Sequence, residues 1–382
     1  MPFIVLHLDF HLPLRLRAYG FFDIGLSQDY FDGGASRAAL ERFAEGFALP
    51  ACERLLTLTR RHRGRFRVSL SVSGMLLEQM EKGQKPLLES FRRLADTGCA
   101  EFVCGVSHHS LASLFSETEF RRQVALHRRM IRARFGQTPR TFRNTAGICD
   151  EGVARTVRSM SFQTILVEDA FLPPGCKTEA SCRLPGNRAL TALIRHGRFS
   201  GELTGPGAEA LGERLAGEYG GNEIICLAAD CPWSGGDDPG ASSLLRFLAT
   251  APGRLLKERN WRFLTPSEAA AGHRGAEGRA GRSWTGPGPA SRLENHLQRD
   301  AANTLYAMEG QVLGAGSRRL LGTWRALQAS DYLDFLSTKG PSEGARGGVS
   351  RPFASPYDAY IHYMNILRDL SARTGGTSGV RP

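Results

Sequence analysis

The sequence predicts an α/β protein in which a parallel β-sheet or barrel comes first and a helical bundle follows. Short apolar runs alternate with longer amphipathic stretches through the first two thirds of the 382 residues. A segment dominated by Gly, Ala, Arg and Pro then interrupts this alternation, and three amphipathic stretches follow it. Alternating strands and helices are typical of a parallel sheet, whereas consecutive amphipathic helices are typical of a bundle.

The strands are predicted from apolar runs, and the helices from apolar residues that recur every three or four positions. Residues 36–62 and 117–136 show the helical spacing. Gly98 and Gly136 follow amphipathic stretches, at positions where glycine commonly ends a helix. The predicted strands lie in the runs FIVLHLDF, FRVSLSVS, AEFVCGVS, TFRNTAGI, FQTILVED and NEIICLAAD.

Composition divides the chain into three parts. Residues 1–270 contain the alternating strands and helices, residues 271–290 form a predicted linker, and residues 291–382 form the predicted bundle. The linker is placed at AGHRGAEGRAGRSWTGPGPA, which has too little apolar area to order itself strongly. The bundle helices are expected in SRLENHLQRDAANTLYAMEGQVL, RRLLGTWRALQASDYLDFLST and SPYDAYIHYMNILRDLSA.

The strongly basic composition favours solvated helix faces over a polyanion-binding surface. The formal net charge is +11, and the 49 Lys and Arg residues include only five lysines. The arginines are interspersed with acidic residues along the predicted helices, as in FRRQVALHRRMIRARFG. A basic patch would gather phosphates by releasing counterions, but this even distribution indicates no such patch, so no nucleic-acid partner is expected.

The cysteines indicate reduced, mostly buried thiols. Eight of them are scattered at positions 52, 99, 104, 149, 176, 182, 226 and 231, and no pair has the CxxC spacing usual in zinc sites. The first ten residues lack the basic start and apolar run of a signal peptide, and no later stretch is long and apolar enough to span a membrane. We therefore expect a cytoplasmic protein without a membrane partner.

Polar residues follow the predicted strands at the positions where a parallel sheet or barrel binds its ligands. They are His7, Asp9, His11, Ser107, His108, His109, Asn144, Glu168, Asp169 and Asp230. His7, Asp9 and His11 share one face of the first strand, because side chains alternate with period two. This set could bind a metal, as in sugar deacetylases of a related barrel type. Hydrogen bonds to a sugar or a neighbouring loop are the favoured interpretation, so no metal or other cofactor is expected.

Several segments resemble motifs of the glycoside hydrolase family 57 α-amylases. HLPLRLRAYGFFDIG is similar to the opening motif of the family, GCAEFVCGVSHHSLASLF to its second motif and RTFRNTAGICDEGVA to its nucleophile motif. IICLAADCPWSGG is similar to the strand that carries the catalytic acid, and WRALQASDYLDFLSTKG and SPYDAYIHYMNILRDL resemble the helical bundle. The resemblance implies an incomplete (β/α)7 barrel followed by a C-terminal helical bundle that completes the cleft. It also implies retaining hydrolysis of α-1,4-glucans such as starch, glycogen and maltooligosaccharides.

The resemblance also places the catalytic residues, and one of them is missing. Retaining hydrolysis needs two carboxyl groups about 5 to 5.5 Å apart, one as nucleophile and one as acid. The nucleophile glutamate of the family falls on Ala146, and the acid falls on Asp230. A methyl group cannot form the covalent intermediate, so we expect impaired catalysis with glucan binding retained. The substrate contacts implied by the resemblance are His11, His109, Asn144, Glu168, Trp233 and Asp331.

Other departures from the family accompany Ala146. Leu12 replaces a glutamine, Gly105 takes the place of an acidic residue, and Tyr332 takes the place of a histidine. Three alternatives stay open beside the impaired glucan-binding protein. The first is an active glycosidase that uses a displaced carboxylate from Asp150, Glu151, Glu168 or Asp169. The others are a metal-dependent carbohydrate deacetylase using His7, Asp9 and His11, and a scaffold protein.

Overall fold

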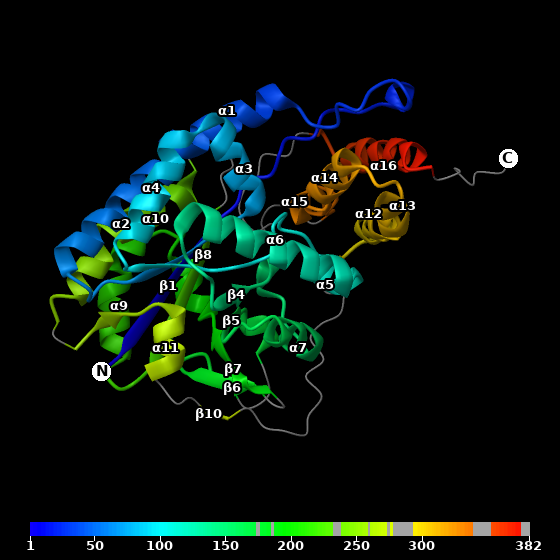
Figure 1. The fold of residues 1–382 in the computed structure, drawn as a ribbon. Helices are drawn as coiled ribbons and strands as arrows, with labels where there is room; N and C mark the ends of the chain where they lie inside the picture. The colour runs from blue at the N-terminus through cyan, green and yellow to red at the C-terminus, as the bar shows by residue number, and fades with distance from the viewer. Residues whose placement is uncertain are drawn as a thin grey trace.

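The computed structural model describes residues 1–172, 176–184, 187–231, 238–258, 260–272, 276–277, 293–338 and 353–375. Strands in the first two thirds of the chain lie among helices, and the C-terminal helices gather at one side of them (Figure 1). Each of the six predicted apolar runs contains a strand. The predicted α/β class with a following helical part is therefore confirmed.

The strands form two sheets. The first has the order β3-β2-β1-β8, built from β1 (Phe3–Phe10), β2 (Val68–Val72), β3 (Ala100–Phe102) and β8 (Ile224–Cys231), with β9 (Arg262–Phe263) also paired to β1. The second has the order β10-β6-β7-β5-β4. Its strands are β4 (Thr141–Arg143), β5 (Thr164–Val167), β6 (Ser181–Leu184), β7 (Asn187–Ile194) and β10 (Ala276–Glu277). The β6–β7 pair is antiparallel and all the other pairs are parallel.

The two sheets meet at both margins and so approximate a barrel. A parallel bridge between Cys104 and Phe142 joins the β3 side to β4. At the other margin, the His196 N–H donates to the Cys226 carbonyl at 2.8 Å and joins the end of β7 to β8. Each of these contacts involves only a few residues of the two margins, which agrees with the incomplete (β/α)7 barrel. Strand β7, which the apolar runs did not predict, completes the ring with β1, β2, β3, β4, β5 and β8.

Helices with one apolar face cover the outside of the strands. Among them, α6 begins after Ser116, whose side chain accepts from the Glu119 N–H, and ends at Gly136, whose φ is 67°. The helices that accompany the strands are α1 (Gly33–Phe43), α2 (Leu49–His62), α3 (Gly74–Gly83), α4 (Lys85–Asp96), α5 (Ala112–Phe115), α6 (Glu117–Phe135), α7 (Glu151–Ser159), α8 (Gly197–Glu202), α9 (Leu211–Glu218), α10 (Pro239–Leu255) and α11 (Pro266–Gly272).

The C-terminal helices share a core with the barrel. One contiguous cluster of buried apolar side chains runs from Phe10 of β1 to Trp324 and Tyr363 of the helical part. The helices concerned are α12 (His296–Ala307), α13 (Glu309–Gly314), α14 (Arg318–Leu327), α15 (Ser330–Asp334) and α16 (Pro356–Arg373). Most of the predicted linker at 271–290 lies outside the described residues. Residues 276–277, which belong to it, pair with β6.

Two expectations about composition are tested by the structure. Cys176 and Cys182 form a disulfide with their Cα atoms 5.6 Å apart, so the prediction of reduced thiols is wrong for this pair. Their spacing matches no motif, and only the path of the intervening chain brings them together.

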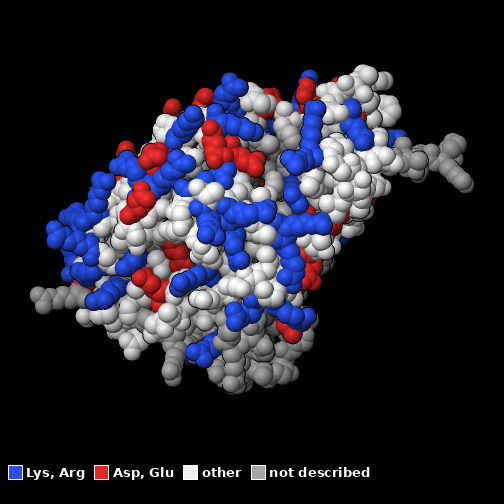
Figure 2. All heavy atoms as spheres, viewed as in Figure 1, with Lys and Arg blue, Asp and Glu red and all other residues white. Residues whose placement is uncertain are grey.

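On the face drawn in Figure 2, Lys and Arg are spread over the surface with Asp and Glu among them. No described helix is long and apolar enough to cross a membrane.

The segment after β1 leaves the barrel and packs on α16 (Figure 1). Asp369 of α16 is the polar centre of this contact. It accepts from the Gly25 N–H at 2.6 Å, from the Tyr30 hydroxyl and from Arg373 Nε at 2.6 Å. Burial raises the pKa of Asp369, but the bonds from Arg373, Tyr30 and Gly25 outweigh it and leave the pKa lowered. The carboxylate is therefore ionised at neutral pH and joins the segment after β1 to α16.

Asp369→Asn should lower the free energy of unfolding at pH 7 by roughly 1–3 kcal/mol, because it weakens charge-assisted bonds at a buried site. Since the folded pKa is depressed, this stabilisation is present above the unfolded pKa and disappears as the pH falls through the folded pKa. Urea unfolding at pH 7 and at pH 3 measures both effects. Glu89→Gln, in an exposed pair with Arg92, is the matched control and should change little. Equal loss in both variants would contradict the central role of Asp369.

Candidate active site

The carboxyl ends of four strands place charged side chains around one arginine. Arg143, the last residue of β4, is buried, with 3% of its side chain exposed. It donates to Asp9 of β1, to Asp230 Oδ1 of β8 at 2.8 Å and to Glu168 Oε1, just after β5, at 3.2 Å. Burial lowers the pKa of Arg143, but the negative charges of Asp230, Asp9 and Glu168 raise it by more. The pKa is therefore above its usual value, and the guanidinium stays charged.

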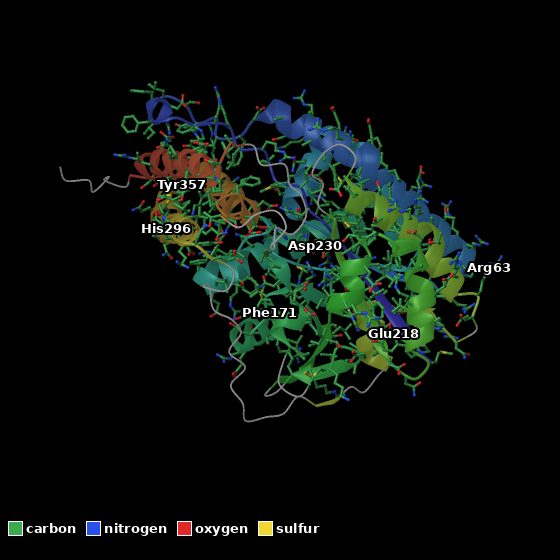
Figure 3. All side chains as sticks on the ribbon, turned by 180° about the vertical axis from the view of Figure 1, so that it is seen from behind. Arg63, Phe171, Glu218, Asp230, His296 and Tyr357 are labelled. Carbon is green, nitrogen blue, oxygen red and sulfur yellow. A yellow bond between two sulfur atoms is a disulfide. The ribbon has the colours of Figure 1, made fainter. Side chains whose placement is uncertain are left out.

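Two of the carboxylate partners of this arginine, Glu168 and Asp230, differ in how exposed they are to solvent. Glu168 is 3% exposed and is also paired through Oε2 with Arg195 Nη1 at 3.2 Å. Asp230 is 40% exposed and lies on the side of the barrel that faces His296 and Tyr357, away from Glu218 and Arg63 (Figure 3). Of the two, Asp230 is the carboxylate that a ligand can reach directly.

The turn after β4 presents Ala146 beside Glu168. Ala146 has φ 54° and ψ 21°, a left-handed conformation that costs a non-glycine residue about 1 kcal/mol or more. Asn144 holds the turn, because its Nδ2 donates to the Ile148 carbonyl at 3.0 Å and to Ser113 Oγ at 2.9 Å. Gly147 follows with φ 62°, and a Cβ there would lie 2.4 Å from Cγ of Glu168. The turn that carries Ala146 is thus strained and packs closely on Glu168 through Gly147.

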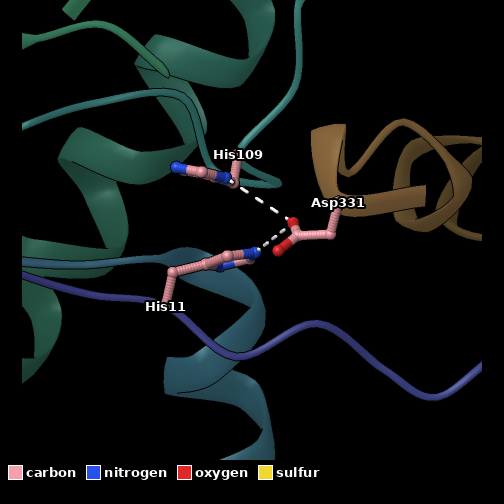
Figure 4. Close-up of side chains that lie close together, drawn as sticks. All are labelled: His11, His109 and Asp331. Carbon is pink, nitrogen blue, oxygen red and sulfur yellow. Dashed lines mark hydrogen bonds and ion pairs between the residues drawn. The ribbon is translucent and has the colours of Figure 1, made fainter. Parts of the chain in front are cut away.

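A second cluster joins the barrel to the helical part. His11, His109 and Asp331 converge there (Figure 4). His11 Nε2 lies 2.9 Å and His109 Nδ1 lies 3.7 Å from Asp331 Oδ2, and the two imidazoles stack with centroids 4.1 Å apart. His11 Nδ1 is 2.8 Å from Ser73 Oγ, and the Ser330 N–H donates to the His109 carbonyl at 3.0 Å.

Asp331 is the ionised carboxylate of this cluster. Burial raises the pKa of Asp331, but the charge of His11 and the bonds from both histidines outweigh it and hold the pKa well below its usual range. Burial lowers the pKa of His11 more than Asp331 raises it. For His109, burial is outweighed by the hydrogen bond and charge of Asp331, so its pKa is raised. The cluster therefore holds one carboxylate against two histidines of unequal basicity.

The structure does not assemble His7, Asp9 and His11 into one metal site. Both ring nitrogens of the buried His7 lie 3.1 Å from serine hydroxyls, those of Ser69 and Ser71. Asp9 binds Arg143, and His11 turns toward Asp331. The alternation that suggested the set holds only within β1, which ends at Phe10, so residue 11 follows a different direction. The hypothesis that these three residues form the metal site of a deacetylase is therefore wrong.

The remaining predicted residues take several places. Asn144, Glu168, Asp230 and Ala146 lie at or beside the Arg143 cluster, whereas His11, His109 and Asp331 form the second cluster. Trp233 lies outside the described residues. Among the proposed substitutes for the nucleophile, Asp150 caps α7 through the Val153 N–H, Glu151 pairs with exposed Arg155, and Asp169 is exposed.

The structure shows the surroundings of the three residues that were expected to depart from the family pattern. A Cβ at Gly105 would lie 2.9 Å from the Arg143 carbonyl, so an acidic side chain does not fit there without a shift of β4. Tyr332 is buried, and its hydroxyl donates to the Leu14 carbonyl at 2.8 Å. Leu12 is buried in the core, where its apolar side chain is compatible with its surroundings.

Arg143 and Arg195 were missed as site residues. Arg143 stands inside the apolar run TFRNTAGI, and a charge at the end of a predicted buried strand is the signal that could have identified it. Arg195 follows β7, the strand that was not predicted, so its position at a strand end was hidden. Both are recognisable from the structure because Glu168 bridges them.

Comparison with known proteins places this chain in a family. The model of glycosyl hydrolase family 57 matches residues 5–278, which is more than half of the chain. A Methanocaldococcus jannaschii protein whose name ascribes alpha-amylase activity to it is 26% identical over 376 residues, covering 90% of this chain and 79% of the relative.

Solved structures share the fold at low sequence identity. A branching enzyme of family 57 from Thermococcus kodakaraensis superimposes with a TM-score of 0.65 at 14% identity, over 97% of this chain and 89% of its own. A 4-alpha-glucanotransferase from Thermococcus litoralis has a TM-score of 0.64 at 13% identity over 87% of this chain, which spans only 54% of that longer enzyme. The alpha-amylase AmyC from Thermotoga maritima has a TM-score of 0.59 at 13% identity and matches 98% and 94% of the two chains. The match of the family model, with these similar folds, shows that this chain belongs to glycosyl hydrolase family 57.

Proposed function

We propose that this protein binds α-1,4-glucans at the carboxyl ends of its barrel strands and that its hydrolytic activity is impaired. The observation that carries the proposal is Ala146, a methyl side chain at the nucleophile position beside an acid position that keeps Asp230. The relatives named as an alpha-amylase, a branching enzyme and a 4-alpha-glucanotransferase support the substrate class, and the branching enzyme was solved with glucose. Loss of a covalent nucleophile removes several orders of magnitude of rate, whereas it leaves binding contacts in place.

Two groups of side chains are assigned to the glucan. Asp230 takes the acid position and is the exposed carboxylate of the Arg143 cluster. His11, His109 and Asp331 are proposed to donate to and accept from sugar hydroxyls, and Asn144 orients the turn that carries Ala146. Paired polar groups of this kind fix the orientation of a ligand whose hydroxyls need partners in both roles.

A second candidate is an active glycosidase in which Glu168 replaces the missing nucleophile. Arg143 Nη2 lies within 2.8 Å of Asp230 Oδ1 and within 3.2 Å of Glu168 Oε1. The two carboxylate oxygens are therefore at most about 6 Å apart, close to the separation that retaining hydrolysis uses. Against this candidate, both oxygens of Glu168 are engaged by arginines and the side chain is almost fully buried. Attack on a sugar would require Glu168 to leave both ion pairs, so the impaired protein is favoured.

Glucan binding is checked by calorimetric titration of the purified protein with maltooligosaccharides. We expect measurable binding without release of reducing sugar over long incubation. Asp230→Asn should weaken binding about tenfold or more, because it removes a charged hydrogen-bond acceptor worth roughly 1.5–3 kcal/mol. The control is Glu218→Gln, which lies at the far end of the barrel (Figure 3) and should bind as the wild type does. Absence of binding at millimolar ligand would refute the substrate class.

The impairment is checked by Ala146→Glu, which returns a carboxylate to the nucleophile position. We expect hydrolysis of maltooligosaccharides to rise at least a hundredfold above the wild-type background, since a covalent nucleophile restores the double displacement. Ala146→Gln has the same size without the nucleophile and should stay inactive. Glu168→Gln tests the second candidate in parallel. If the wild type hydrolyses glucan and Glu168→Gln abolishes that activity, Glu168 is the nucleophile and the proposed impairment is wrong.

A further inference from the structure

His11, His109 and Asp331 present three metal-ligating atoms within 4.8 Å of one another. They come from three separate segments: the end of β1, the loop after β3 and helix α15. Figure 4 shows both imidazoles directed at the carboxylate of Asp331. Among the residues that the structure describes, these three form the cluster of His, Cys, Asp or Glu side chains that is close enough to hold a metal ion. Two imidazole nitrogens and one carboxylate oxygen are a donor set that suits zinc, cobalt, nickel or copper better than magnesium or calcium.

The spacing of these atoms fits one ion. Zinc binds imidazole nitrogen at about 2.0–2.1 Å and carboxylate oxygen at about 2.0–2.2 Å, so the ligand atoms of a tetrahedral site lie roughly 3.3–3.5 Å apart. Asp331 Oδ2 is 2.9 Å from His11 Nε2 and 3.7 Å from His109 Nδ1. The first distance is shorter than this separation and the second is longer, each by roughly a few tenths of an ångström, so small rotations of the side chains bring all three atoms to one ion.

The stacked rings must tilt before both lone pairs reach one ion. Their planes differ by 25°, whereas lone pairs that converge on a metal require rings that open toward it. His109 has room for this rotation, because 25% of its side chain is exposed, compared with 8% for His11. The buried ring is therefore the fixed ligand and the more exposed ring is the adjustable one.

Neighbouring groups orient the ligands as the surroundings of a metal site do. The ring nitrogen of His11 that faces away from Asp331 is 2.8 Å from Ser73 Oγ, and Ser73 also caps α3 through the Leu76 N–H. Metal-binding histidines usually bond their second nitrogen in this way, which fixes the ring. His109 adopts φ 54° in a loop tied to Ser330, and such strained residues gather at ligand-binding sites.

We propose that His11, His109 and Asp331 bind one transition-metal dication, with Zn²⁺ as the representative ion. Three protein ligands leave at least one coordination position for water or a ligand hydroxyl, as in zinc sites that are not purely structural. Because Asp331 belongs to α15 and the histidines to the barrel, the ion joins the two parts of the molecule. The proposal departs from the expectation of a protein without cofactors. The ion uses the side chains that are also proposed as glucan contacts, so with the ion bound a sugar hydroxyl would meet its open coordination position. Binding of the ion itself does not require glucan.

The test uses the full-length protein, stripped of metal with a chelator and then titrated with Zn²⁺ by calorimetry and with Co²⁺ by visible absorption. We expect one equivalent of Zn²⁺ and a cobalt absorption band of a nitrogen and oxygen site. Binding should weaken at least tenfold in Asp331→Asn and in His109→Ala, while His296→Ala, which removes an exposed histidine elsewhere, should bind as the wild type does. Zn²⁺ should raise the Tm of the wild type and of His296→Ala only, since binding to the folded state stabilises it.

Three results would overturn the metal site. They are absence of stoichiometric binding by the wild type, equal binding by Asp331→Asn and the wild type, and loss of binding in His296→Ala. The first would leave the cluster as a hydrogen-bonded ion pair only. Circular dichroism of each variant separates loss of a ligand from loss of folding, and His109→Ala keeps the test valid if Asp331→Asn does not fold. The titrations contain no glucan, so their failure is distinguishable from failure of the maltooligosaccharide titration.

Discussion

The ion-pair cluster around Arg143 is the interaction on which the carboxyl end of the barrel depends. Moving a charged guanidinium out of water is expensive, and the cost is recovered only when several good partners surround it. Asp9, Glu168 and Asp230 supply those partners from β1, the end of β5 and β8. The arginine therefore ties three other strands to β4 at the edge where a barrel holds its ligands. Of its partners, Asp230 is partly exposed to solvent, whereas Glu168 is buried.

This cluster also supports the turn that carries Ala146. Ala146 contributes no side-chain hydrogen bond, yet its turn is determined by neighbours on both sides. Asn144 closes the turn through the Ile148 carbonyl, and Gly147 accepts the close approach of Glu168. Glu168 is in turn held by Arg143 and Arg195. The strained φ of Ala146 is therefore maintained by the surrounding bonds.

The contact between the barrel and the helical part is polar at the site and apolar behind it. Asp331 binds His11, and the Tyr332 hydroxyl donates to the Leu14 carbonyl. Behind these bonds, one cluster of buried apolar side chains continues from the barrel into α14 and α16. The helical part therefore supplies a charged residue to the barrel end and cannot be regarded as an independent appendage. Whether residues 271–290 act as a linker stays a prediction of composition alone.

The sequence by itself determined the local features of this protein. Apolar runs located six strands, and glycine at position 136 located the end of α6. These features depend on residues a few positions apart, whose spacing is visible in the chain.

Only the tertiary structure decided which polar groups meet. His11 and Asp331 are 320 positions apart, and their contact requires the helical part to pack on the barrel. Arg143 and Asp230 are 87 positions apart, and their contact requires the two sheets to meet. For the same reason the chain alone suggested His7 and Asp9 as partners of His11, whereas folding gave His7 to two serines and Asp9 to Arg143. Alternation along a strand fixes a face, but the partner across that face is set by packing between distant segments.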